Sequence, residues 1–351
     1  MISRLDFDMA KEPRASILIV YTGGTLGMDY DENGSLVPCG FEQVLKRVPV
    51  LKELNINLSV ASFDPPIDSS NINSSHWVSM AKIIQEQYDA FDGFIVLHGT
   101  DTMAYSASAL SFMLQGVNKP IIFTGAQLPI ASPRSDGHEN FVTALEIAAD
   151  KKDGIPLVSE VCIFFNHLLL RGNRSKKVES QHFDAFETEN YPVLAEAGIV
   201  IDYNLPSIRP YDPNAKLRLF TELSEDVLIL KLFPGINKYT AANILGAPNV
   251  RGIIMESYGS GNVPHQPWFL ELLTQTIESG VVVLNVSQCN GGRVVQGKYE
   301  ASSSLNHIGV VSGRDLTTEA ATMKMMYALG RYTDVMDIKN CLTTSVSGEI
   351  N

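Results

Sequence analysis

The stretch Ser16 to Met28, SILIVYTGGTLGM, decides the fold of the first half of the chain. Its aliphatic run from Ile17 to Val20 predicts a buried strand, and Gly23-Gly24-Thr25 ends that strand abruptly. Because glycine has no Cβ, the backbone there can adopt positive φ and bring its N–H groups close to a ligand, with the Thr25 hydroxyl following. This geometry suits a nucleophile beside an oxyanion site. The same tripeptide is more often an ordinary turn after a first strand.

Neither of the two common nucleotide-binding fingerprints occurs in this stretch. The G-x-G-x-x-G spacing of dinucleotide-binding folds is absent, and so is the G-x-x-x-x-G-K-[ST] of a phosphate loop. A nucleotide function therefore has little support. A hydride-transferring enzyme remains a fallback at the level of the fold alone, and a nucleotide-binding assay would reveal it.

The pattern of a buried strand that ends in glycine and threonine occurs a second time. Residues 93–102 read GFIVLHGTDT, and residues 103–115 are rich in small side chains, which predicts a helix packed closely on the sheet. A third strand at 120–125 and a helix near 139–149 follow. Alternating strands and helices predict a parallel sheet, whose ligands bind beyond the carboxyl ends of the strands, where Thr25, Thr100 and Asp101 fall.

The length of 351 residues exceeds the usual size of one hydrophobic core. Residues 202–226 carry three prolines with weak periodicity, which predicts an interdomain linker, and new strands are expected at 227–233, 252–258 and 281–286. We therefore expect an α/β protein. A larger N-terminal domain, 1–201, holds a mainly parallel sheet flanked by helices and both threonine motifs, and a smaller α/β (flavodoxin-like) domain spans 227–351.

Composition indicates small-molecule chemistry. The formal net charge of −12 disfavours nucleic acid and anionic membranes, and no apolar run approaches transmembrane length. The four cysteines lie far apart and form no metal-binding pattern, so neither a metal nor an organic cofactor is expected. Free thiols and an N-terminus without the apolar core of a signal peptide predict a cytoplasmic protein.

Four motifs together resemble the asparaginase family, in particular the cytoplasmic bacterial type I enzymes. YTGGTLGM around Thr25 is similar to the first threonine motif of the family, and LHGTDTMAYSASALSFML around Thr100 is similar to the second. Asp68-Ser69-Ser70 stands where the family has a substrate-binding loop, and RGNR followed by Lys176-Lys177 is similar to its lysine segment. The resemblance extends from about residue 17 to the last helices.

The resemblance implies hydrolysis of L-asparagine to L-aspartate and ammonia, and amide cleavage needs a nucleophile, an oxyanion site and a proton for the leaving group. Thr25 is the expected nucleophile, although attack by a water activated at Thr100 is the alternative. The backbone N–H groups of Gly24 and Thr100 are the candidates for the oxyanion hole. Thr100, Asp101 and Lys177 form the expected second set, with Lys176 as an alternative one residue away.

The same resemblance assigns the ends of the amino acid. Asp68 and Ser69 are expected to bind its amino and carboxylate groups, with Ser70 in the same loop, while Asp101 holds the substrate ammonium. A lysine normally titrates near ~10.4, so a basic role for Lys177 requires desolvation or a nearby cation, and Arg171, Arg174 and Lys176 are candidates for that cation.

One position departs from the family pattern. Many asparaginases have a tyrosine in the loop after the first threonine, where this chain has Ser35. Tyr30 is close but out of register, and Tyr299 is the second candidate, from a region that approaches a neighbouring subunit's site in related enzymes. Tyr299 would then make the active site depend on a homodimer or on a tetramer built as a dimer of dimers.

Three other functions stay open for this sequence. A broader asparaginase/glutaminase would accept glutamine as readily, and an amino-acid-binding relative would keep the fold without catalysis. An amidotransferase subunit acting on charged tRNA has an additional N-terminal domain, whereas the first strand is expected near residue 16. Regulation by asparagine is not assumed, because the surroundings of Lys176 and Glu256 look unlike those of bacterial members.

Overall fold

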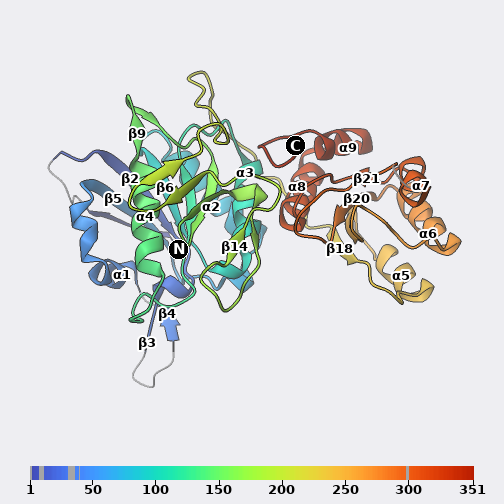
Figure 1. Ribbon diagram of the computed structural model, residues 1–351, viewed down its shortest axis with the longest axis horizontal. Helices are drawn as coiled ribbons and strands as arrows, with labels where there is room; N and C mark the ends of the chain where they lie inside the picture. Colours follow the sequence, from blue (N-terminus) through green and yellow to red (C-terminus); the bar gives the residue numbers. More distant parts are fainter. Residues whose placement is uncertain (1, 8–11, 31–35, 39, 298–299) are drawn as a thin grey trace. The chain divides into compact units, whose positions relative to one another are not determined.

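The computed structural model describes the chain except for residues 1, 8–11, 31–35, 39 and 298–299. The chain divides into two compact units, Met1–Phe220, coloured from blue through green to yellow in Figure 1, and Thr221–Asn351, coloured from yellow through orange to red. The boundary lies inside 202–226, the segment that the sequence predicts as a linker. Most of that segment belongs to the first unit. Its strands at 201–203 and 218–219 pair with strands of the first unit at 195–197 and 114–115.

The first unit is built on a nine-stranded sheet with the order β1-β5-β2-β6-β8-β11-β12-β15-β16. Its central strands are parallel, and the pairs β1-β5, β11-β12, β12-β15 and β15-β16 are antiparallel. The bounds are β1 Ile2–Phe7, β2 Ala15–Tyr21, β5 Ile56–Phe63, β6 Gly93–Leu97, β8 Ile121–Thr124, β11 Val161–Phe165, β12 Leu168–Arg171, β15 Ala195–Ala197 and β16 Ile201–Tyr203.

Helices cover the sheet, and short two-stranded ladders extend the loops. The helices are α1 Phe41–Arg47, α2 Ser74–Glu86, α3 Met103–Met113 and α4 Gly137–Ala149. The short strands are β3 Met28–Tyr30, β4 Leu36–Pro38, β7 Leu114–Gln115, β9 Lys151–Lys152, β10 Ile155–Pro156, β13 Lys176–Lys177, β14 Phe186–Glu187 and β17 Arg218–Leu219.

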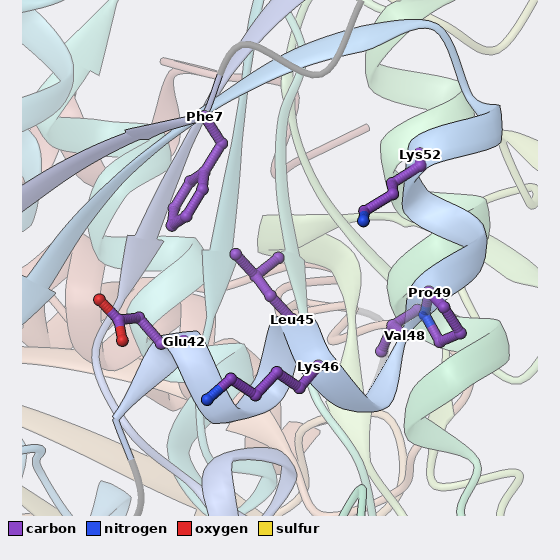
Figure 2. Close-up of a pocket in the computed structure, with 7 residues that line it drawn as sticks. All are labelled: Phe7, Glu42, Leu45, Lys46, Val48, Pro49 and Lys52. Carbon is purple, nitrogen blue, oxygen red and sulfur yellow. The ribbon is translucent and has the colours of Figure 1, made fainter.

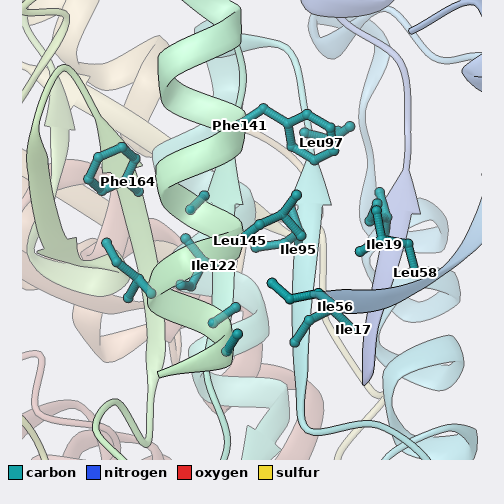
Figure 3. Close-up of a cluster of buried hydrophobic side chains, with 14 of the residues drawn as sticks. Ile17, Ile19, Ile56, Leu58, Ile95, Leu97, Ile122, Phe141, Leu145 and Phe164 are labelled. Atoms are coloured by element: carbon teal, nitrogen blue, oxygen red, sulfur yellow. The ribbon is translucent and has the colours of Figure 1, made fainter. Parts of the chain in front are cut away.

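Alternate residues of the central strands face opposite sides of the sheet, as the period of two requires. On one side, Ile17, Ile19 and Ile95 pack against Phe141 and Leu145 of α4 (Figure 3). The intervening residues of β2 and β6 are also buried. Burial on both faces explains why the sequences of these strands are continuous apolar runs. The first polar or glycine residues after each run mark the end of the strand.

Two predictions about helices need correction at their carboxyl ends. The helix predicted at 103–115 ends at Met113, because Leu114–Gln115 leaves it to pair with β17, and the Phe220 N–H donates to the Met113 carbonyl at 2.8 Å. The helical spacing of Trp77, Met80, Ile84 and Tyr88 in the sequence predicts one amphipathic face, but α2 ends at Glu86, so Tyr88 lies beyond it.

The first strand of the structure precedes the one expected near residue 16. β1 runs antiparallel to β5 and covers the edge of the parallel sheet, with Ile2 opposite Phe63. An uncovered edge leaves backbone donors and acceptors unpaired, and β1 satisfies those of β5. The prediction that the sheet begins near residue 16 is therefore wrong.

The second unit holds a four-stranded parallel sheet with the order β18-β19-β20-β21 and its own apolar core. Its elements are β18 Val227–Lys231, α5 Lys238–Leu245, β19 Gly252–Ser257, α6 Pro267–Glu278, β20 Val282–Ser287, α7 Glu300–Ile308, β21 Val311–Ser312, α8 Thr318–Arg331 and α9 Val335–Thr343. The predicted fold class, a large mainly parallel α/β domain followed by a smaller α/β domain, is confirmed.

Two further properties concern the chain as a whole. Cys162, Cys289 and Cys341 are free thiols. In the part of the chain that the structure describes, no helix is long and apolar enough to cross a membrane.

Candidate functional site

The two glycine-threonine turns lie against each other at the carboxyl edge of the sheet. β2 and β6 are parallel neighbours with Tyr21 opposite Leu97, so the chain leaves both strands side by side. Gly24 has φ 90°, and a Cβ added to it would lie 2.5 Å from the Gly99 nitrogen. Only glycine tolerates both the positive φ and this approach. The sequence predicts that the backbone of this turn can adopt positive φ, and both Gly23 and Gly24 do so.

A third loop closes on the same point. The Ile67 N–H donates to the Thr22 carbonyl at 2.7 Å, and a Cβ added to Gly99 would lie 2.5 Å from Ser69 Oγ. The Thr102 hydroxyl donates to the Ser69 carbonyl at 2.8 Å. Backbone and side-chain contacts therefore fix the loop that carries Asp68, Ser69 and Ser70 beside the turn that carries Thr100.

Thr100, Asp101 and Lys177 form one hydrogen-bonded group. Lys177 Nζ donates to Thr100 Oγ1 at 2.7 Å and to Asp101 Oδ1 at 2.7 Å. The Lys177 side chain is 17% exposed, whereas that of Asp101 is 70% exposed. The lysine thus contacts the hydroxyl from inside the protein, and the aspartate presents its carboxylate to solvent.

The Thr100 hydroxyl also forms a hydrogen bond with Gln127. Thr100 Oγ1 donates to Gln127 Oε1 at 3.0 Å, while Gln127 Nε2 donates to the His182 carbonyl at 3.1 Å. The Thr100 oxygen therefore accepts from the lysine and gives its own proton to the amide. The sequence analysis did not find Gln127, because a lone glutamine in a loop carries no motif. Its position directly after the third strand end is the signal that could have found it.

The lysine is held by a buried segment. Lys177 lies in β13 opposite Phe186, and the chain reaches it from Arg171, whose Nε donates to Glu160 Oε2 at 2.5 Å in a buried ion pair. Ser175 Oγ donates to the Arg171 carbonyl at 2.7 Å. Arg171 is therefore paired with Glu160. Of the two adjacent lysines, Lys177 is the one that forms a hydrogen bond with Thr100.

Thr25 begins a single 3₁₀ turn, Thr25–Gly27, and is half-buried. Within the described residues, no side chain or carbonyl group forms a hydrogen bond with its hydroxyl. The same holds for the backbone N–H groups of Gly24, Thr25 and Thr100. Donors without protein acceptors at a glycine-lined turn are available to an oxyanion.

The contacts of Asp68 favour its ionised carboxylate form. The Ser70 N–H donates to Asp68 Oδ1 at 2.9 Å, and this bond, with the Ser70 hydroxyl, lowers the pKa of Asp68 below its ordinary value of 3.8. An exposed carboxylate that stays ionised suits the ammonium group of an amino acid. An open cavity of about 670 Å³ is lined by Asp68 and by Phe63, Asp64, Pro65, Pro66, Ile67, Asn71, His76 and Ser79.

Two predictions about tyrosine fall outside what the structure describes. Tyr299, and the Ser35 position aligned with the family tyrosine, lie outside the described residues. Tyr30 ends β3, and its side chain is likewise not described.

No cluster of three His, Cys, Asp or Glu side chains that could bind a metal occurs among the described residues.

A second pocket, of about 490 Å³, lies between β1 and the α1 region (Figure 2). It is lined by Phe7, Glu42, Leu45, Lys46, Val48, Pro49 and Lys52. None of these is a candidate catalytic or substrate-binding residue, whereas the other cavity is lined by Asp68.

Comparisons with known proteins agree with the four sequence motifs. The family model described as asparaginase, N-terminal, matches residues 16–209, and the glutaminase/asparaginase C-terminal domain matches residues 226–342. L-asparaginase 1 of Escherichia coli is 38% identical over 339 residues, which are 96% of this chain and 98% of that protein.

Two further relatives extend the comparison. The 60 kDa lysophospholipase of Homo sapiens is 38% identical, and the match covers 96% of this chain but 62% of that protein. The crystal structure of L-asparaginase I from Vibrio cholerae superposes with a TM-score of 0.87 at 36% identity, covering 96% of this chain and 99% of that one. Both glycine-threonine turns and the lysine segment lie within the matched N-terminal region.

Proposed function

The chain belongs to the asparaginase family of amide hydrolases, and we propose that its own reaction is the hydrolysis of L-asparagine to L-aspartate and ammonia. The observation that carries the proposal is the group of Thr100, Asp101 and Lys177 beside the Gly24–Gly99 contact. It combines a hydroxyl, an amine and backbone N–H groups that have no acceptor among the described residues, all at one edge of the sheet.

In the proposed first step, the Thr25 hydroxyl attacks the side-chain amide carbon of asparagine. The carbonyl oxygen becomes an oxyanion, which the N–H groups of Gly24 and Thr100 stabilise, and one such donor is typically worth about 10²- to 10³-fold in rate. Collapse of the intermediate breaks the C–N bond, the proton given up by the Thr25 hydroxyl passes to the leaving nitrogen, and ammonia departs while an ester to Thr25 remains. The half-exposed position of Thr25 at the glycine turn supports this role.

In the second step, water hydrolyses the ester and releases aspartate. Thr100 and Lys177, the latter as a neutral amine, would accept the proton of that water, and the 2.7 Å contact between the lysine nitrogen and the threonine oxygen supports this role. Direct attack on asparagine by a water held at Thr100 is the alternative, and the same two residues would activate it. The two routes differ in whether a covalent intermediate forms on Thr25.

Recognition of the amino acid is proposed for the exposed carboxylates and the adjacent serines. Asp101 and Asp68 would bind the substrate ammonium, and Ser69 with Ser70 would bind its α-carboxylate. The lowered pKa of Asp68 supports its role as an anion. Such a site rejects a simple amide that lacks the ammonium and carboxylate groups, because its charged groups would then stay unpaired.

We also propose that Tyr299 of a neighbouring subunit acts on Thr25, so that the enzyme functions in the cytoplasm as a homodimer or as a dimer of dimers. The proposal comes from the family resemblance, and the variants Tyr30→Phe and Tyr299→Phe test it. Loss of activity with retained folding in Tyr30→Phe, but not in Tyr299→Phe, would reject it. Light scattering of the same samples gives the oligomeric state.

The experiment that tests the function is ammonia release by the purified protein over a wide range of L-asparagine concentration. L-glutamine tests the broader asparaginase/glutaminase alternative, and propionamide tests the need for charged ends. Comparable kcat/KM for the two amino acids would favour the broader enzyme. Folded protein that binds asparagine but releases no ammonia would instead identify a non-catalytic amino-acid-binding relative.

A further inference from the structure

A buried chain of hydrogen bonds runs from α2 to the turn that carries Thr100. The Trp77 indole N–H donates to Ser106 Oγ at 2.8 Å. Ser106 Oγ lies 2.9 Å from His98 Nε2, and His98 Nδ1 lies 2.7 Å from the Gly99 carbonyl oxygen. His98 and Ser106 are buried, and neither has a place in the proposed chemistry.

The partners determine the tautomer of His98. A carbonyl oxygen only accepts, so Nδ1 must carry the hydrogen that bonds to Gly99. Burial lowers the pKa of His98 to about 4, which keeps the ring neutral at physiological pH. A neutral ring has one hydrogen, so Nε2 accepts from the Ser106 hydroxyl, and the Ser106 oxygen accepts from Trp77. Each polar side-chain atom in this series of hydrogen bonds then has a compatible partner.

This chain of bonds sets the direction of one peptide group. In a trans peptide the C=O and the following N–H point in opposite directions. Because the Gly99 carbonyl points to His98 in the core, the N–H of Thr100 points away from the core. That N–H has no acceptor among the described residues, and it lies beside the Gly24 turn.

We propose that His98 is a positioning residue, which orients the Gly99–Thr100 peptide so that the Thr100 N–H faces the reacting carbonyl oxygen. Ser106 and Trp77 hold the imidazole in the tautomer that does this. The inference rests on the proposed function, because it assigns the oriented N–H to the oxyanion of that reaction. His98 transfers no proton in it.

The sharpest test is a pair of amide substitutions. The side-chain nitrogen of asparagine can take the place of Nδ1, whereas that of glutamine can take the place of Nε2 and leaves the Gly99 carbonyl without a donor. His98→Asn is expected to keep kcat within about threefold of wild type. His98→Gln is expected to lower kcat by about 10- to 100-fold with little change in KM, because an oxyanion donor acts in the transition state.

A second pair keeps the test valid where His98→Gln does not fold. Ser106→Ala removes the donor to Nε2, so the imidazole loses the contact that holds its ring in the orientation from which Nδ1–H reaches the Gly99 carbonyl. Ser108→Ala is the matched control, since Ser108 is equally buried in α3 and its Oγ has no hydrogen-bond partner in the part of the chain that the structure describes. We expect a lower kcat for Ser106→Ala and an unchanged kcat for Ser108→Ala.

A spectroscopic measurement separates this inference from the proposed function. ¹⁵N NMR of histidine-labelled protein, with His98→Asn for assignment, reports the tautomer without any substrate. A neutral Nδ1–H ring that does not titrate between about pH 5 and 9 supports the inference, even if no ammonia is released from asparagine. An Nε2–H or cationic ring at pH 7 would overturn it. So would full kcat in both His98→Gln and Ser106→Ala of an active enzyme.

Discussion

Lys177 Nζ and Thr100 Oγ1 lie 2.7 Å apart, although 77 residues separate them in the chain. The lysine donates to the threonine oxygen and, at 2.7 Å, to Asp101. The threonine hydrogen is directed to Gln127 at 3.0 Å. A hydroxyl with an amine on one side and an amide oxygen on the other is held in one orientation, which general acid–base catalysis requires.

Lys177→Met is therefore expected to lower kcat by about 10²- to 10⁴-fold, the usual contribution of a positioned acid–base group. Lys176→Met is the matched control, because it removes the same charge from the neighbouring position in β13. Steady-state kinetics with L-asparagine measure both variants. Equal losses in the two variants would remove the assignment to Lys177.

Thr25→Ala is expected to abolish covalent chemistry, with kcat reduced by at least about 10³-fold, whereas Thr25→Ser keeps a hydroxyl and retains most of the activity. Mass spectrometry of rapidly quenched wild-type enzyme measures the acyl-enzyme directly. A Thr25→Ala variant that still hydrolyses asparagine at near wild-type rates would favour direct attack by water at Thr100.

Gly24→Ala tests the contact between the two turns through stability. A positive φ costs a non-glycine residue roughly 1–2 kcal/mol, and the clash with the Gly99 nitrogen at 2.5 Å adds overpacking of about 1–3 kcal/mol. Gly154→Ala is the control, because Gly154 has φ +79° and a Cβ added there would meet nothing within 4 Å.

Urea unfolding of the two glycine variants gives the difference in the free energy of unfolding. Gly24→Ala is expected to lose more stability than Gly154→Ala, along with its activity. Equal losses would mean that the backbone of the two turns can separate at no cost, contrary to the close contact described for Gly24 and Gly99.

The second unit contains a fully buried ion pair whose loss is expected to destabilise that unit. Lys324 Nζ lies 2.6 Å from Glu349 Oε1, and both side chains are 0% exposed. Breaking a buried pair by removing one partner typically costs about 3–5 kcal/mol, whereas an apolar replacement of both partners costs far less. Glu349→Gln is therefore expected to be less stable than Lys324→Met/Glu349→Leu, as measured by urea unfolding.

The same pair predicts the response of stability to acid. Burial alone raises the pKa of Glu349, but Lys324 and the N–H groups of Val346 and Ser347 outweigh it and lower the pKa below 4.5. A carboxyl whose pKa is lower in the folded than in the unfolded protein stabilises the fold above the unfolded pKa, and this stabilisation is lost as pH falls through the folded value. Unfolding of Glu349→Gln should depend less on pH below about 4.5 than unfolding of wild type. An identical dependence would contradict this role.

The sequence predicted the centre of the large sheet because its strands are buried on both faces. Continuous apolar runs ending in Gly-Gly-Thr and Gly-Thr-Asp mark β2 and β6, and their parallel pairing brings the two turns together. Features that depend on distant pairing were not predicted. β1 mixes polar and apolar residues and covers the edge of β5, and β7 pairs with β17 more than a hundred residues away in two-residue strands.

In the candidate site, too, local features could be predicted from the sequence, and features that depend on distant contacts could not. Thr100 and Asp101 could be predicted, because a polar cluster directly after a buried strand is a local signal. Between Lys176 and Lys177 the sequence alone left the choice open, since adjacent residues of a strand point in opposite directions and nothing local fixes which one faces Thr100. Gln127 and His98 act through contacts with the Thr100 turn, so their roles follow only from the folded arrangement.

The measurement that tests the central claim most directly is a double-mutant cycle of Thr100→Val and Lys177→Met, read as kcat/KM for L-asparagine from ammonia release. Groups that act as one catalytic unit are strongly non-additive. We predict that the double variant is about as slow as the slower single variant. Losses that multiply would show that the two residues act independently, and a wild-type protein that releases no ammonia would contradict the proposed reaction itself.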